Sequence, residues 1–103
     1  MKKVISSPLA PAAIGPYSQA TEAAGLVFVS GQLPIDAATG DMPEGIEAQA
    51  RQSLLNIQHI LEAAGLTMSH IVKTTVYLQD MSLFGSMNAV YATFFEGDYP
   101  ARA

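Results

Sequence analysis

The stretch that decides the fold reads IEAQARQSLLNIQHILEAAG and occupies residues 46–65. Its apolar side chains recur every three or four residues, the spacing that places them along one face of an α-helix. These side chains are Ile46, Ala50, Leu54, Ile57, Leu61 and Ala64. Gly65 comes next and suits the left-handed conformation in which many helices end. The stretch therefore predicts a long amphipathic helix whose apolar face packs against another layer of the domain.

The neighbouring segments predict that this layer is a β-sheet. HIVKTTVYLQ, at residues 70–79, is β-branched and alternating, which is typical of a strand. One face of this strand is predicted to consist of Val72, Thr74, Val76 and Leu78. Further upstream, Glu22 to Gly25 separates the run YSQAT from the apolar run LVFVSGQL and predicts the turn of a β-hairpin.

A second helix is predicted from about Ser82 to Glu96, because apolar residues recur there at helical spacing. Asp80 or Ser82 is suited to cap it. The order is then strand, hairpin strands, helix, strand and helix. This order predicts an α+β fold in which two helices pack on one side of a sheet.

Composition limits the classes of function. At 103 residues the chain forms one domain, and the lack of cysteine excludes thiolate nucleophiles and cysteine-bound zinc. The net charge is −4 and the five basic residues are scattered, so nucleic acid is not expected as the main partner. No stretch approaches the roughly 20 apolar residues of a membrane span, and no secretory signal pattern is present. We therefore expect a soluble, cytoplasmic protein with no membrane partner.

The sequence contains few charged residues for a domain of its size. Charged residues make up 14% of the sequence, against a usual share of about 25%, and hydrophobic residues make up 50%. A domain of this size has a large surface to cover. We expect part of its apolar surface to be buried against other copies of the chain.

Most familiar catalytic and metal-binding patterns are missing. His59 and His70 have no carboxylate at ligand spacing, so both are interpreted as structural or surface residues and no metal site is expected. Neither GxGxxG nor GxxxxGK occurs, so a phosphate-binding loop has no support. Ser30 follows a predicted strand, where a nucleophilic serine could lie, but the GxSxG motif is absent. A Ser-Gly pair at the end of a strand more often marks a β-bulge or a place where the backbone is approached closely.

Three polar features are harder to assign to packing alone. Tyr17 follows a Gly-Pro pair that directs the chain, and it is either a core tyrosine or an aimed ring and hydroxyl. Asn88 flanks the apolar face of the second helix, where its amide needs partners across an interface or in a ligand. Arg102, introduced by the stiff Tyr99-Pro100-Ala101, is either a surface charge or a guanidinium that grips an anion.

Six strings in unbroken order together resemble the RidA/YjgF family of enamine/imine deaminases. They are GPYSQA (15–20), VSGQLP (29–34), QARQSLLNI (49–57), VKTTVYLQD (72–80), MNAVYATFF (87–95) and PAR (100–102). The resemblance runs the whole length of the chain. No single string is decisive, but the series is specific.

The resemblance implies a chorismate-mutase-like α+β fold and a homotrimer whose three sheets form a central barrel, with ligand clefts between adjacent subunits. It also implies hydrolysis of 2-aminoacrylate and 2-aminocrotonate to 2-oxo acids and ammonia, without a cofactor. The small-molecule partner is then a 2-imino acid. The alternative is a non-catalytic trimeric protein that binds small carboxylates or amino acids in the same cleft.

Site residues follow from the same resemblance, position by position. Arg102 matches the arginine that grips the substrate carboxylate, so it is the expected catalytic residue and a substrate ligand. Tyr17 is expected beside the substrate, Ser30 and Gly31 along the cleft, and Asn88 as a hydrogen-bonding side chain from the second helix. In the family, proton transfer is linked to a backbone carbonyl and to a glutamate that follows the arginine.

The position of that glutamate lies beyond Ala103, the last residue of this chain. Members of the family usually continue from this point through further strands. We therefore expect residues 1–103 to be a single RidA-like domain that is C-terminally incomplete. The chain would be either a fragment of a longer product, which we favour, or a naturally shortened relative.

Overall fold

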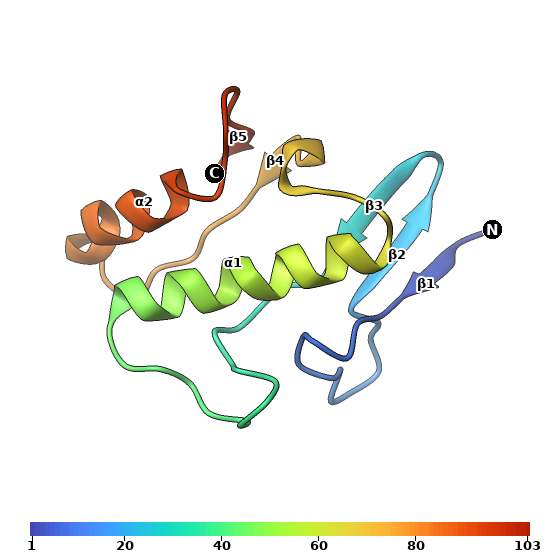
Figure 1. Ribbon diagram of the computed structural model, residues 1–103, viewed down its shortest axis with the longest axis horizontal. Coiled ribbons are helices and arrows are strands. Elements are labelled where there is room, and N and C mark those ends of the chain that lie inside the picture. The colour runs from blue at the N-terminus through green and yellow to red at the C-terminus, as the bar shows by residue number, and fades with distance from the viewer.

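Two helices and two small β-sheets make up the chain in a computed structural model that describes residues 1–103 (Figure 1). In chain order, the elements are β1 (Lys3–Ile5), β2 (Ala20–Ala23), β3 (Leu26–Val29), α1 (Ile46–Ala63), the 3-10 helix η1 (Met68–His70), β4 (Lys73–Thr74), the 3-10 helix η2 (Met81–Leu83), α2 (Phe84–Ala92) and β5 (Ala101–Arg102). The predicted α+β class is confirmed. The predicted elements occur in the predicted order, and the short strand β5, which was not predicted, follows the second helix.

The first sheet is antiparallel, with strand order β1-β2-β3. Its hairpin turns through Ala24 and Gly25, whose φ angles are 53° and 77°. Two consecutive left-handed residues are typical of the tight turn whose twist matches that of the flanking strands. The predicted hairpin is confirmed, although Glu22 and Ala23 still pair with β3 and the turn itself is shorter than predicted.

Helix α1 covers one face of this sheet (Figure 1). Ile5, Ala20 and Val29 lie side by side across the three strands, and they pack with Ile60 of α1, which is fully buried. Val4, Thr21 and Phe28 form the corresponding row on the other face. Val4 and Phe28 are each 57% exposed there, so one face of the sheet belongs to the core and the other is uncovered.

The other side of α1 packs against α2 in a second core cluster. This cluster consists of Leu54, Leu61, Met68, Met87, Tyr91 and Phe95. Because α1 is buried on two sides, its buried surface is wider than the single predicted stripe. Asn56 and Ile60 lie outside that stripe and yet are both fully buried.

The second sheet is a short parallel pair in which β4 lies beside β5. The prediction of one sheet is wrong in this respect, because β4 pairs with β5 and not with the hairpin. The predicted strand at residues 70–79 is wrong at its ends, since His70 belongs to η1 and only Lys73 and Thr74 form a ladder.

The alternation predicted for this segment holds along most of it. Thr74, Val76 and Leu78 are partly buried, and the last two pack against the core. Val72, predicted on the same face, is 73% exposed. A regular strand needs a ladder partner, and here the partner β5 spans only two residues.

The predicted second helix is too long at both ends. Asp80 accepts a hydrogen bond from the N–H of Ser82, which caps the 3-10 helix η2 rather than α2 and lowers the pKa of the Asp80 carboxyl below its usual value. At the other end, the Thr93 hydroxyl donates to the carbonyl of Val90 at 2.6 Å. The following N–H groups bond three residues back, so the last turn tightens and the α-helix ends at Ala92.

Neither helix combines the length and the apolar character that a membrane-crossing segment requires.

Candidate active site

Arg102 lies where the second sheet meets α2. Strand β5 places it opposite Thr74 in the parallel register. Its Nη1 donates a hydrogen bond of 2.6 Å to Oδ1 of Asn88. The centre of its guanidinium lies 4.8 Å from the ring centroid of Tyr91 and 5.4 Å from that of Phe84, within the range of a cation–π contact. We call Arg102, Asn88, Tyr91 and Phe84 the arginine cluster.

Helix α2 supplies three members of the arginine cluster at helical spacing. Phe84, Asn88 and Tyr91 are separated by four and three residues, so they line one face of the helix. All three are electrically neutral, so they hold the guanidinium without cancelling its positive charge. The site therefore keeps an available cation.

The orientation of the Asn88 amide follows from its partner. A guanidinium has only donors, so the amide oxygen of Asn88 must face it, as the 2.6 Å contact shows. The amide N–H groups then point away from the guanidinium and donate to no group of the chain. Guanidinium and amide together present N–H donors on one side of α2, which suits a ligand rich in oxygen acceptors.

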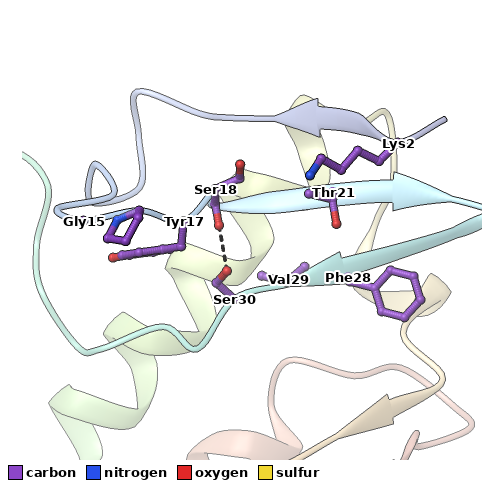
Figure 2. Close-up of a pocket in the computed structure, with 9 residues that line it drawn as sticks. Lys2, Gly15, Tyr17, Ser18, Thr21, Phe28, Val29 and Ser30 are labelled. Atoms are coloured by element: carbon purple, nitrogen blue, oxygen red, sulfur yellow. Dashed lines mark hydrogen bonds between the residues drawn. The ribbon is translucent and has the colours of Figure 1, made fainter.

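Tyr17 and Ser30 line a second feature, an open cleft of about 600 Å³ (Figure 2). The other residues along it are Lys2, Gly15, Pro16, Ser18, Thr21, Phe28 and Val29. Tyr17 is 49% exposed, so it is not a core tyrosine. Its N–H donates to the carbonyl of Gly15 at 2.9 Å, and this tight turn lays the ring against Gly15 at one end of the cleft. We call this feature the tyrosine cleft.

Hydrogen bonds fix Ser30 at the edge of the tyrosine cleft. Its hydroxyl donates to the carbonyl of Ser18 at 2.6 Å (Figure 2), and its N–H donates to the carbonyl of Gln19 at 2.9 Å. Because the hydroxyl proton is already engaged, the oxygen is left as an acceptor. No histidine contacts it, so the arrangement is not that of an activated nucleophile.

Gln19 holds in place the backbone next to the tyrosine cleft. Its side chain is 5% exposed, and its Oε1 accepts from the N–H of Ser7 at 2.6 Å. Its Nε2 contacts the carbonyls of Ser7, Ala10 and Pro11, which ties the N-terminal loop to the segment that carries Tyr17. Gln19 is not among the residues predicted from the sequence to form the site. Its position within GPYSQA, directly before a strand, was the only signal available.

The structure brings some of the predicted residues together and keeps others apart. Arg102 and Asn88 are in contact, and Tyr17 and Ser30 share a cleft. Gly31 follows Ser30 but does not line the cleft. No contact joins the arginine cluster to the tyrosine cleft within one chain. Figure 1 accordingly shows α2 and the β2–β3 hairpin at opposite ends of the molecule.

The two histidines make local contacts with the backbone. His59 Nδ1 lies 3.2 Å from the carbonyl oxygen of Leu9, and His70 Nδ1 accepts from the N–H of Thr67 at 3.0 Å. No group of three histidine, cysteine, aspartate or glutamate side chains is placed to hold a metal ion. These contacts tie loops to α1 and to η1 and leave the histidines outside both candidate features.

Comparison with known proteins places the chain in a family. A family model described as Endoribonuclease L-PSP matches residues 7–103. The 2-iminobutanoate/2-iminopropanoate deaminase of Mus musculus is 48% identical over 104 residues, which cover 100% of this chain and 77% of that protein.

Solved structures agree with this placement. The YjgF gene product of Escherichia coli matches with a TM-score of 0.95 at 46% identity, over 98% of this chain and 82% of that one. TdcF of Escherichia coli, solved with bound serine, matches with a TM-score of 0.95 at 42% identity and with the same coverage. Both sequence and fold therefore assign the chain to the RidA/YjgF family, the group whose family model is described as Endoribonuclease L-PSP.

Proposed function

We propose that this protein is a 2-iminobutanoate/2-iminopropanoate deaminase, which hydrolyses 2-aminoacrylate, 2-aminocrotonate and their imine forms to 2-oxo acids and ammonia. The observation that carries the proposal is the guanidinium of Arg102, which is held only by neutral partners. A planar fork of N–H donors suits the bidentate grip of a carboxylate. The name of the Mus musculus relative supports this choice of reaction.

In the proposed reaction, Arg102 binds the substrate carboxylate and thereby fixes the neighbouring imine carbon for attack by one water molecule. The water oxygen bonds to this carbon and gives up one proton, while the C=N π electrons move to nitrogen, which takes one proton up. The resulting carbinolamine then expels ammonia as the C=O bond forms. One water is consumed and one ammonia is released, so the step needs neither an oxidant nor a reductant.

We further propose that Asn88 donates an amide N–H to the bound substrate and that Tyr17 packs beside it. Ser30 would accept a hydrogen bond from the imine nitrogen, since its own proton is engaged by Ser18. Gly31 does not line the tyrosine cleft within one chain, and its backbone would face the substrate only once the cleft and the arginine cluster meet. These roles require the tyrosine cleft and the arginine cluster to meet, which one chain does not achieve.

A homotrimer would solve this problem, and we propose that the protein forms one. The uncovered face of the first sheet carries the apolar side chains of Val4 and Phe28, and the tyrosine cleft opens beside Phe28. Burying this face against a neighbouring subunit would remove apolar surface from water. It would also place the tyrosine cleft of one subunit at the boundary with the next, where the arginine cluster of that subunit could complete it.

Ammonia release from freshly generated 2-aminoacrylate tests the proposed reaction. We expect Arg102→Ala to lower kcat/KM on the order of 10²- to 10⁴-fold, since two charge-assisted hydrogen bonds are lost. Arg51→Ala is the matched control, because Arg51 is the only other arginine and is exposed on α1. An Arg102→Ala protein that keeps full activity would show that Arg102 is not the carboxylate ligand.

The second candidate function is binding without catalysis. The structure of TdcF was solved with bound serine, a small molecule with a carboxylate. If this protein bound serine or a 2-oxo acid through Arg102 but released no ammonia, the binding function would replace the deaminase. Calorimetric titration with the same two compounds, on wild-type protein and Arg102→Ala, separates the two functions.

A further inference from the structure

The guanidinium of Arg102 has to be held by side-chain contacts, because the Arg102 backbone lies in a very short strand. Arg102 is an exposed residue on a strand of two residues. A free arginine side chain has many rotamers, and ordering it costs conformational entropy. A carboxylate ligand that had to order this side chain would bind less tightly.

Tyr91 is the member of the arginine cluster best fixed in space. It is 5% exposed, and its ring packs against that of Phe95 at a centroid distance of 4.9 Å. Its hydroxyl shares a hydrogen bond of 2.8 Å with the hydroxyl of Thr74. Phe84 and Asn88, the other two partners of Arg102, are less buried than Tyr91. Tyr91 also makes the shorter of the two cation–π contacts.

Thr74 contacts both the Arg102 backbone and the Tyr91 side chain. It is the residue of β4 that lies opposite Arg102 in the parallel ladder, and the N–H of Ala103 donates to its carbonyl at 3.0 Å. Thr74 therefore positions the Arg102 backbone through the ladder. Through its hydroxyl, it also orients the ring on which the Arg102 side chain rests.

We propose that Tyr91, oriented by the hydroxyl of Thr74, is a positioning residue that holds the Arg102 guanidinium ready for a carboxylate. The ring does this through its negative face, which attracts the cation and restricts it to one place. Tyr91 itself touches no reacting atom. Its effect on ligand binding passes entirely through Arg102, and only the kinetic part of the test rests on the proposed deaminase activity.

Nuclear magnetic resonance of the two arginine side chains tests the positioning without any substrate. The chain has only two arginines, so its spectrum contains two Nε–H signals, and Arg51 serves as an internal reference. We expect the Arg102 signal, assigned by its loss in Arg102→Ala, to be shifted upfield by the Tyr91 ring current. In Tyr91→Leu this signal should move towards the Arg51 position, and in Thr74→Val it should move part of the way.

A matched variant controls for simple loss of packing. Ile60 is fully buried on α1, but it belongs to the other core cluster, with Ile5, Ala10 and Ala20, and not to the cluster of Tyr91. Ile60→Ala should lower Tm and leave the Arg102 signal in place. If Tyr91→Leu does not fold, Thr74→Val decides the matter, because it leaves the ring in the core. An Arg102 signal that stays unchanged in every folded variant of Tyr91 and Thr74 would overturn the proposal.

Kinetics provides the second arm of the test. Tyr91→Leu should raise KM for 2-aminoacrylate roughly 2- to 30-fold, the range expected for a lost cation–π contact, with a smaller change in kcat. Tyr91→Phe keeps the ring and should recover most of this loss. In the Arg102→Ala background, Tyr91→Leu should change KM no further, whereas an independent added loss would contradict action through Arg102. If wild-type protein releases no ammonia, the proposed deaminase reaction is contradicted but the proposed role of Tyr91 is not. The magnetic resonance comparison would still test whether Tyr91 holds the Arg102 guanidinium in place.

Discussion

Arg102 is a long, exposed side chain on a very short strand, yet its guanidinium has three defined contacts. Each contact comes from a residue that is neutral, so the positive charge stays available to a ligand. The planarity of the guanidinium matters as much as its charge, because the same plane stacks on aromatic rings and presents paired donors. A residue with charge alone would satisfy only part of this arrangement.

This distinction leads to a prediction for Arg102→Lys. An ammonium group is a point charge that neither stacks as a plane nor grips a carboxylate in a bidentate way. We therefore expect kcat/KM of Arg102→Lys to remain within about 10-fold of that of Arg102→Ala. The measurement is ammonia release by both variants across a range of substrate concentration. Recovery of wild-type kcat/KM by lysine would mean that charge alone suffices at this position.

At the scale of elements, the β2–β3 hairpin holds the sheet in register and supplies Ser30 at its end. Its turn contains Ala24 with a φ of 53°, the only non-glycine residue of the chain with a positive φ. Alanine in the left-handed region costs roughly 1–2 kcal/mol, because its Cβ approaches the following carbonyl. Gly25, with a φ of 77°, occupies the second left-handed position without this cost.

Ala24→Asn should therefore stabilise the protein. Asn-Gly is the preferred pair for this turn, because asparagine tolerates the left-handed conformation. We expect a gain of up to about 1 kcal/mol in the free energy of unfolding, measured by urea denaturation. The companion change, Gly25→Ala, should cost about 1–2 kcal/mol for backbone reasons alone, since an added Cβ meets no atom within 4 Å. An Ala24→Asn protein less stable than wild type would show that the turn is not limited by this strain.

At the scale of the whole molecule, the proposed homotrimer would account for both the uncovered face of the first sheet and the position of the tyrosine cleft beside it. The row of Val4, Thr21 and Phe28 faces away from α1, so the chain's own helices leave it exposed. The tyrosine cleft opens on the same face. Self-association through this face would bury the row and bring a second chain to the edge of the cleft.

Val4→Glu tests this assembly, because Val4 lies in the exposed row without lining the tyrosine cleft. A carboxylate buried in a subunit interface without a partner is costly, so the variant should dissociate. We expect light scattering to give a trimer mass for wild-type protein and a monomer mass for Val4→Glu. Met42→Glu, at an exposed apolar residue in the loop before α1, should keep the trimer. Wild-type protein that scatters as a monomer at micromolar concentration would contradict the trimer.

The sequence by itself determined the elements whose signals are local. The apolar spacing of residues 46–64 predicted α1, Gly65 predicted its end, and Glu22 to Gly25 predicted a hairpin turn, although the structure narrowed this turn to Ala24 and Gly25. The α+β class followed from the order of these elements. The candidate residues Arg102, Asn88, Tyr17, Ser30 and Gly31 were also named from the sequence, through their position in strings that resemble a family.

Only the tertiary structure decided how these pieces meet. Which strand pairs with which is a matter of contacts between residues far apart in sequence, so the split into two sheets and the short ladder of β4 with β5 left no local signal. Asn56 is buried where its amide donates to the carbonyls of Leu33 and Ile35, in the loop after β3, which are far from it in sequence. The contacts of Tyr91 with Thr74 and Arg102 likewise join α2, β4 and β5, and no spacing along the chain records them.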